Sequence, residues 1–151
     1  MGILDSLSIS ASALTAERTR MDVTAENLAN AQTTRTAAGG AYRRKVVELA
    51  QDGGSAGFGA QLASAMGPAA SRTDSGGGVK VTGIVNDATP LKTVYDPGHP
   101  DANAQGYVQM PNVEPVEEMV DLITESRSYE ANVTAMQSAK TMFTRTLDLL
   151  R

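Results

Sequence analysis

The feature that most constrains this 151-residue chain is a heptad pattern that runs without interruption over residues 116–151. Large apolar side chains recur every seven residues, and a second series lies three residues before the first. The two series are Leu122, Tyr129, Met136, Phe143 and Leu150, and Met119, Ser126, Val133, Lys140 and Leu147. Apolar residues at alternate spacings of three and four predict a long helix that packs along another helix.

The sequence around this segment also supports a helix. Pro115 stands near the first turn, where its missing N–H costs no hydrogen bond, and no Gly or Pro follows it. Acidic residues come early and basic residues late, as the helix dipole favours. Such a helix would be roughly 50 Å long. The free energy from burying its seam does not exceed the backbone entropy of ordering it, so we expect it to need a helical partner.

The partner that the sequence offers is a second helix over residues 3–31. Two series spaced by seven recur there, namely Leu7, Leu14, Met21 and Leu28, and Leu4, Ala11, Arg18 and Ala25. We therefore expect a mainly α fold in which long N- and C-terminal helices pair as a coiled coil. The spacing is equally compatible with pairing between chains and with a helical hairpin that closes the core of a monomer.

The middle of the chain predicts a small β lobe. Four short stretches have strand composition, at residues 42–49, 79–86, 91–95 and 106–110, and together they suit one antiparallel patch. A Gly-, Ser- and Ala-rich insertion at 51–78 interrupts them, with at most a short helix around residues 61–66. The expected organisation is a helix at 1–34, a lobe at 35–111 and a helix at 112–151, within one structural domain.

Composition excludes several classes of function. The chain has no Cys, which rules out disulfides, thiolate metal sites and cysteine nucleophiles, and it has one His. The formal net charge of −4 argues against a general nucleic-acid binder. The N-terminal residues lack the basic and apolar regions of a cleavable signal peptide, and no membrane span is predicted.

No motif in the sequence predicts a catalytic or ligand-binding site. His99 lies in a Pro-rich turn next to Asp96 and Asp101, and turn structure explains this pattern better than a metal site does. The Gly-rich stretch before Lys80 lacks the spacing and the hydroxyl of a phosphate loop. The basic triplet at residues 43–45 suits a solvated or interface strand edge. We expect no catalytic residue, no cofactor and no metal, and therefore not an enzyme.

Polar residues inside the two helices are more informative. An Asn within a helix and a Tyr on a seam are costly unless they meet partners, so Asn27, Asn30, Tyr129 and Asn132 are candidates for contacts that set the register between helices. Asn30 is also placed to cap its helix. The full predicted assembly interface is Leu7, Leu14, Met21, Asn27, Leu28, Asn30, Met119, Leu122, Arg127, Tyr129, Asn132, Val133, Met136, Phe143, Leu147 and Leu150.

Several stretches carry a family likeness. Residues 21–33 (MDVTAENLANAQT) resemble the N-terminal signature of flagellar rod and hook axial proteins. Within that family, residues 42–45 (YRRK), 94–100 (VYDPGHP), 106–113 (GYVQMPNV) and 117–121 (EEMVD) resemble the FlgC-type proximal-rod branch. The likeness covers residues 1–50 and 79–151, and the chain departs from it at 51–78.

The resemblance implies a structural subunit of the bacterial flagellar basal body. Family members are exported through the flagellar type III channel without a cleavable signal, and their terminal helices assemble into the hollow, periplasm-spanning rod that transmits torque for motility. The implied partners are copies of the chain, other rod proteins and the membrane-ring base. Three alternatives stay open on the residues alone: another axial or type III secretion rod component, a soluble coiled-coil adaptor, and an enzyme or metal-binding domain that depends on His99.

Overall fold

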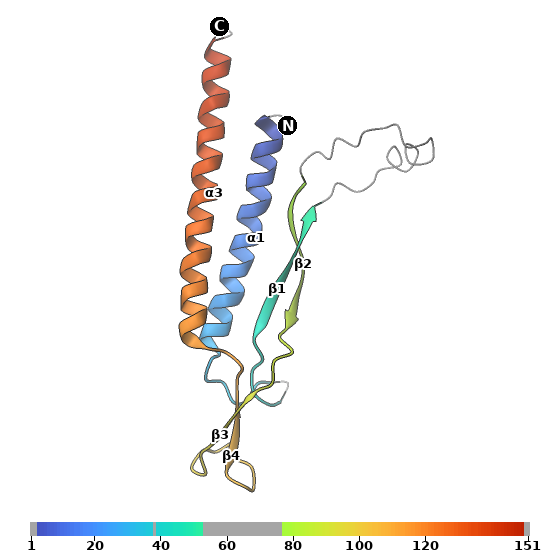
Figure 1. The fold of residues 1–151 in the computed structure, drawn as a ribbon, viewed down its shortest axis with the longest axis vertical. Helices are drawn as coiled ribbons and strands as arrows, with labels where there is room; N and C mark the ends of the chain where they lie inside the picture. The colour runs from blue at the N-terminus through green and yellow to red at the C-terminus, as the bar shows by residue number, and fades with distance from the viewer. Residues whose placement is uncertain (1–2, 38, 53–76, 150–151) are drawn as a thin grey trace, which may run out of the picture.

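The computed structural model describes residues 3–37, 39–52 and 77–149. Two long helices and a β-hairpin lie side by side, and a second, smaller hairpin extends from one end of this group (Figure 1). The elements in chain order are α1 (Ile3–Ala29), β1 (Lys45–Asp52), β2 (Gly78–Asn86), β3 (Lys92–Tyr95), β4 (Tyr107–Met110) and α3 (Pro115–Leu149).

The predicted fold class is confirmed. The two terminal helices contact each other and run antiparallel, and short antiparallel strands lie between them in the sequence (Figure 1). The helices fall within two residues of the predicted bounds. Most of the predicted insertion at residues 51–78, with its short helix, and the seam residue Leu150 lie outside the described residues, while β1 and β2 extend into the insertion at residues 51–52 and 78.

The prediction of one antiparallel patch is wrong, because the four strands form two separate two-stranded sheets. β1 pairs with β2, and β3 pairs with β4. A short connection follows β2, in which Asp87 accepts hydrogen bonds from the backbone and the hydroxyl of Thr89, and Pro90 comes next. The β1–β2 pairing ends at Lys45 and Asn86, and Pro90, which has no N–H to donate, separates it from the β3–β4 pair.

α1 is the central layer of the molecule. It contacts α3 on one side and the β1–β2 hairpin on the other (Figure 1). The apolar core of the described residues is thin, and its buried side chains are Ala16, Val23, Tyr42, Val108 and Val113. Since so little apolar area is removed from water, polar contacts must decide how α1 and α3 fit together.

The hairpin docks on α1 through a close backbone approach. The Val79 N–H donates to Ser12 Oγ at 3.1 Å, and Ser12 Oγ donates in turn to the carbonyl of Ile9 at 2.7 Å. A Cβ atom at Gly78 would lie 2.2 Å from Ser12 Oγ. Glycine at this position is therefore what allows β2 to reach the helix.

Candidate assembly interface

A buried amide joins the three layers near the C-terminal end of α1. Asn27 is 1% exposed, and its Nδ2 donates to the carbonyl of Lys45 at 2.9 Å and to Glu118 Oε2 at 3.2 Å. Its Oδ1 accepts from the Lys45 N–H and from the Tyr42 hydroxyl, both at 2.9 Å. One side chain therefore fixes α1 against β1 and α3 with four hydrogen bonds.

The carboxylate that Asn27 contacts is itself paired. Glu118 is 1% exposed, and its Oε1 accepts a hydrogen bond from Arg44 Nε. The same guanidinium lies 3.4 Å from Asp121 and 3.9 Å from Asp87. The hydrogen bond to Glu118 is the main reason that the pKa of Arg44 lies above its ordinary value, and burial opposes it. A buried carboxylate with a guanidinium and an amide as partners is satisfied.

Tyr42 completes this cluster, which we call the Asn27 node: Asn27, Tyr42, Arg44, Lys45 and Glu118. Burial, followed by the charges of Glu26 and Glu118, raises the pKa of Tyr42 to about 12. The phenol therefore stays protonated and donates to Asn27 at any physiological pH. Every member of the node uses a polar group to hold the α1–β1–α3 junction, so its role is structural.

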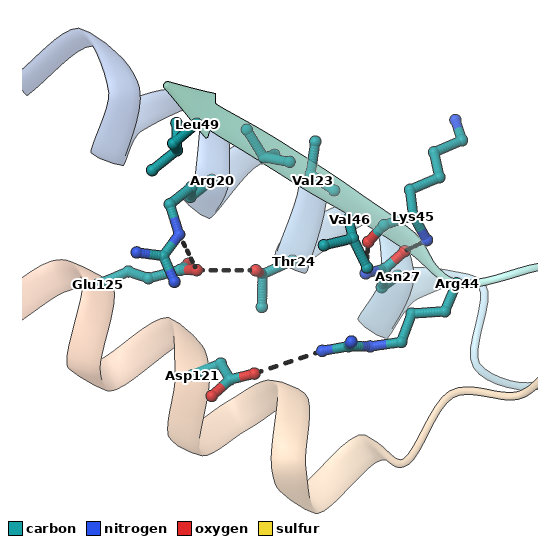
Figure 2. A pocket seen from close by; sticks show the side chains of 11 residues that line it. Arg20, Val23, Thr24, Asn27, Arg44, Lys45, Val46, Leu49, Asp121 and Glu125 are labelled. Atoms are coloured by element: carbon teal, nitrogen blue, oxygen red, sulfur yellow. Dashed lines mark hydrogen bonds and ion pairs between the residues drawn. The ribbon is translucent and has the colours of Figure 1, made fainter. Parts of the chain in front are cut away.

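A second polar contact lies further along the two helices (Figure 2). Glu125 of α3 is 5% exposed, and its Oε1 accepts from the Thr24 hydroxyl at 3.3 Å and lies 3.4 Å from Arg20 Nε. Oε2 of Glu125 and Oε2 of Glu17 are buried without a hydrogen-bond partner. Burial is the main cause that raises the pKa of Glu125, and the charges of Glu17 and Asp121 add to it.

These side chains border an open, polar groove of about 310 Å³ between α1, β1 and α3 (Figure 2). Within the described part of the chain, no group of three or more His, Asp or Glu residues is arranged to hold a metal ion. His99 lies in the predicted turn, where its Nδ1 accepts from the Asp101 N–H at 3.1 Å. The geometry is that of a set of polar contacts that holds α1 against α3.

Comparison with known proteins identifies the family to which the chain belongs. The C-terminal family model of flagellar basal-body rod FlgEFG proteins matches residues 104–149, and the flagella basal-body rod protein model matches residues 7–35. The flagellar basal-body rod protein FlgC of Bacillus subtilis is 50% identical over 153 residues, covering 99% of both chains. FlgC of Borreliella burgdorferi is 41% identical over 155 residues, covering 100% of this chain and 99% of its own.

FlgC of Escherichia coli O6:H1 is 42% identical over 149 residues, covering 99% of this chain and 98% of its own. The chain belongs to the FlgC family of flagellar basal-body rod proteins. The resemblance drawn from the sequence motifs is thus confirmed, and with it a structural, non-enzymatic function in the flagellar basal-body rod. Among the residues described, no helix has the length and apolar character needed to cross a membrane.

The predicted interface residues occupy three environments in this FlgC-family chain. Asn27 is buried in the node, and Asn30 caps α1, because its Nδ2 donates to the carbonyl of Glu26 at 2.9 Å. The half-buried set is Leu7, Leu14, Met21, Leu28, Leu122, Tyr129, Asn132, Val133 and Met136. The exposed set is Met119, Arg127, Phe143 and Leu147.

Glu118, Glu125, Arg44 and Tyr42 were not among the predicted interface residues, although they carry the contacts between layers. Glu118 and Glu125 are seven residues apart and flank Leu122, so they share its helix face. Two acids at heptad spacing beside an apolar seam were the available signal. Hydrophobic periodicity does not register them, because it treats every charged residue as solvent-facing.

The buried carboxylate of Glu125 should make the stability of the chain depend on pH. Because burial raises the pKa of Glu125 above its ordinary 4.5, the folded FlgC-family chain holds this proton more tightly than the unfolded chain does. The resulting stability is present below pH 4.5 and is lost as the pH rises through the raised pKa. Glu125→Gln cannot ionise, so its unfolding free energy should fall less than that of the wild type across this interval.

Urea unfolding followed by circular dichroism at a series of pH values measures this difference. The exposed Glu130 of the same helix supplies the control, Glu130→Gln, whose pH dependence should parallel that of the wild type. If Glu125→Gln also ran parallel to the wild type, Glu125 would not be held in its neutral form by the fold.

Proposed function

We propose that this chain is a subunit of the proximal segment of the rod, and that each copy closes its α1–α3 pair internally and assembles through surfaces left outside that pair. The observation that carries the proposal is an apolar stripe on the first turns of α3. Its members are 46–62% exposed, and they are Val116, Met119, Val120 and Ile123. We call this set the α3 stripe.

The α3 stripe lies on the side of the helix that faces away from α1. Glu118, Leu122 and Glu125 recur at spacings of four and three and define the side toward α1, since Glu118 and Glu125 contact α1 residues. Val120 lies about 160° around the helix from Leu122, at 100° per residue. Four large apolar side chains on an outer face are costly in a free chain, and a neighbouring subunit would remove them from water.

A rod requires different surfaces of one subunit to meet in a head-to-tail sense, because such heterologous contacts generate open helical assemblies. The α3 stripe supplies one such surface, and the exposed Arg127, on the same outer side of the helix, extends it along α3. In this proposal Met119 and Arg127 contact neighbouring subunits, while Asn27 and the half-buried residues hold each subunit together.

The proposal includes the organisation and partners expected from the sequence. Residues 1–34, 35–111 and 112–151 form one structural unit, which assembles with copies of itself, with other rod proteins and with the membrane-ring base in the periplasm. Export through the flagellar type III channel belongs to the same proposal, supported by family membership. A thin core suits a chain that is exported before it folds fully.

Val120→Asp tests the proposal, since Val120 is 57% exposed and lies in the α3 stripe. We expect the unfolding free energy of the purified chain, measured in urea, to match that of the wild type within about 0.5 kcal/mol, because the site is on the surface. Incorporation into basal bodies and swimming motility should be lost. Val120→Thr keeps the side-chain shape and serves as the matched control, with motility retained. Full motility of Val120→Asp would show that this face is not a rod interface.

A further inference from the structure

The two ends of the elongated molecule both carry exposed apolar side chains. At one end α3, with 35 residues, continues past α1, with 27 residues (Figure 1). The difference of eight residues leaves residues 142–149 as the overhang, which corresponds to roughly 12 Å of helix. Phe143 and Leu147 continue the heptad series of Met136, so they lie on the side of α3 that faces α1 in the earlier turns. Both are exposed, as is Met142.

The opposite end is the β3–β4 hairpin with its loop, which we call the tip (Figure 1). Tyr95 and Tyr107 pair across the strands at the loop end of the hairpin, with ring centroids 5.2 Å apart in an edge-to-face arrangement. Tyr95 is 64% exposed and Tyr107 is 45% exposed. Two of the four tyrosines of the chain are therefore presented to solvent at its extremity.

Hydrogen bonds and a close ring contact hold the loop of the tip in one arrangement. Asn103 Oδ1 accepts from the Gln105 and Tyr107 N–H groups at 3.0 and 2.9 Å, and the Asp96 N–H donates to the Gly106 carbonyl at 2.9 Å. Gly106 has φ +81°, and a Cβ there would lie 2.9 Å from the Tyr95 ring. A preorganised pair of exposed aromatic rings is the usual anchor of a protein interface.

The tip is also tied to the body of the molecule. The Thr34 hydroxyl donates to Asp101 at 2.8 Å, Arg35 lies 3.8 Å from the same carboxylate, and Lys92 pairs with Glu114. Within the tip itself, Asp101 and Lys92 are therefore paired. Asp96, beside Tyr95, makes no ion pair with any described residue.

The last turns of α3, in and just before the overhang, carry the complementary charge. Lys140 and Arg145 are exposed and form no ion pair within the described part of the chain, against one carboxylate at Asp148. The C-terminal part of α3 is thus apolar with two cations and one carboxylate among residues 140–149, and the tip is aromatic with an acid that forms no ion pair with a described residue. Methionine and aromatic rings also attract each other beyond their apolar area.

Building on the proposed rod function, we propose that the tip docks head to tail on the basic, apolar end of the C-terminal helix of an axially adjacent rod subunit. The overhang of α3 in this chain shows the kind of helix end that the tip of a neighbouring subunit would contact. Tyr95 and Tyr107 pack against large apolar side chains of the Met142, Phe143 and Leu147 kind, and Asp96 faces a cation equivalent to Lys140 or Arg145. Opposite ends that complement each other extend an assembly without closing it.

A photoreactive amino acid at Thr93 tests this contact in intact flagellated cells. Thr93 is exposed and shares the strand face of Tyr95, so the probe replaces neither an aromatic ring nor a charge. After illumination and isolation of basal bodies, peptide mapping should place the adduct in the last turns of the C-terminal helix of a rod subunit. Asp96→Lys in the same labelled chain should lower the adduct yield several-fold.

A probe at Thr134, exposed midway along α3, is the matched control and should give no adduct to such a helix end. The proposal is overturned if labelled, motile cells give no Thr93 adduct, or an adduct that maps elsewhere. Absence of the chain from purified basal bodies would instead contradict the proposed rod function, so the two failures are distinguishable.

Discussion

Asn27→Ala should destabilise the isolated chain by at least about 3 kcal/mol, because it leaves several buried polar groups without a hydrogen-bond partner, and each such group costs roughly 1–3 kcal/mol. The Lys45 N–H and carbonyl, the Tyr42 hydroxyl and Glu118 all lose a partner. A typical domain is stable by only about 5–15 kcal/mol, so this loss should lower the urea midpoint strongly. Urea unfolding monitored by circular dichroism gives the value, and swimming motility should fall with it.

Asn30→Ala is the matched control for this change. Asn30 is three residues away, directly after the end of α1, but its amide caps the helix and makes no contact with β1 or α3 among the hydrogen bonds of the described residues. Its loss should cost about 0.5–1.5 kcal/mol. Equal destabilisation by the two variants would mean that the Asn27 node does not hold the three layers together.

Leu122→Asp should unfold the helix pair and block incorporation into the rod. Leu122 is half-buried and shares a helix face with Glu118 and Glu125, both of which contact α1. A third carboxylate on this face adds repulsion to the loss of apolar packing, and removal of a buried leucine alone typically costs about 2–5 kcal/mol. We expect at least about 3 kcal/mol in urea unfolding and no motility.

Leu122→Met preserves the volume and should cost less than about 1.5 kcal/mol, with assembly intact. The comparison with Val120→Asp separates the two faces of α3. Substitution at Leu122 should reduce the stability of the free chain, whereas substitution at Val120 should reduce only assembly. A stable Leu122→Asp monomer that still failed to assemble would place the subunit contact on the Leu122 face instead.

The sequence predicted the helices and their pairing because periodicity reports burial of large apolar side chains directly. Leu122, Tyr129 and Met136 lie half-buried on the face of α3 that meets α1. The other predicted series begins at Met119, which is exposed. α3 therefore does not present both predicted series equally to α1. Glu118 and Glu125 form buried polar contacts on the α1 side, and hydrophobic spacing does not measure the stability that such contacts contribute.

The remainder of the site depends on contacts between residues far apart in the sequence. Arg44 was part of a basic triplet expected at a solvated or interface edge, and its neighbour Arg43 is exposed. The difference between the two arises because Arg44 meets Glu118, 74 positions along the chain. The four strands likewise had the right composition, but which strands pair, and hence their division into two sheets, is something that local propensity does not resolve.

Hydrogen exchange resolved along the chain, measured on dilute purified monomer, tests most directly whether the helix pair closes within a single chain. The account predicts that α1 from Ala16 to Ala29 and α3 from Pro115 to Tyr129 are protected, since these segments contain the Asn27 node and the Glu125 contact. The overhang beyond Lys140 should exchange rapidly. Rapid exchange throughout both helices would contradict the account, because the α1–α3 pair would then form only between subunits in the rod.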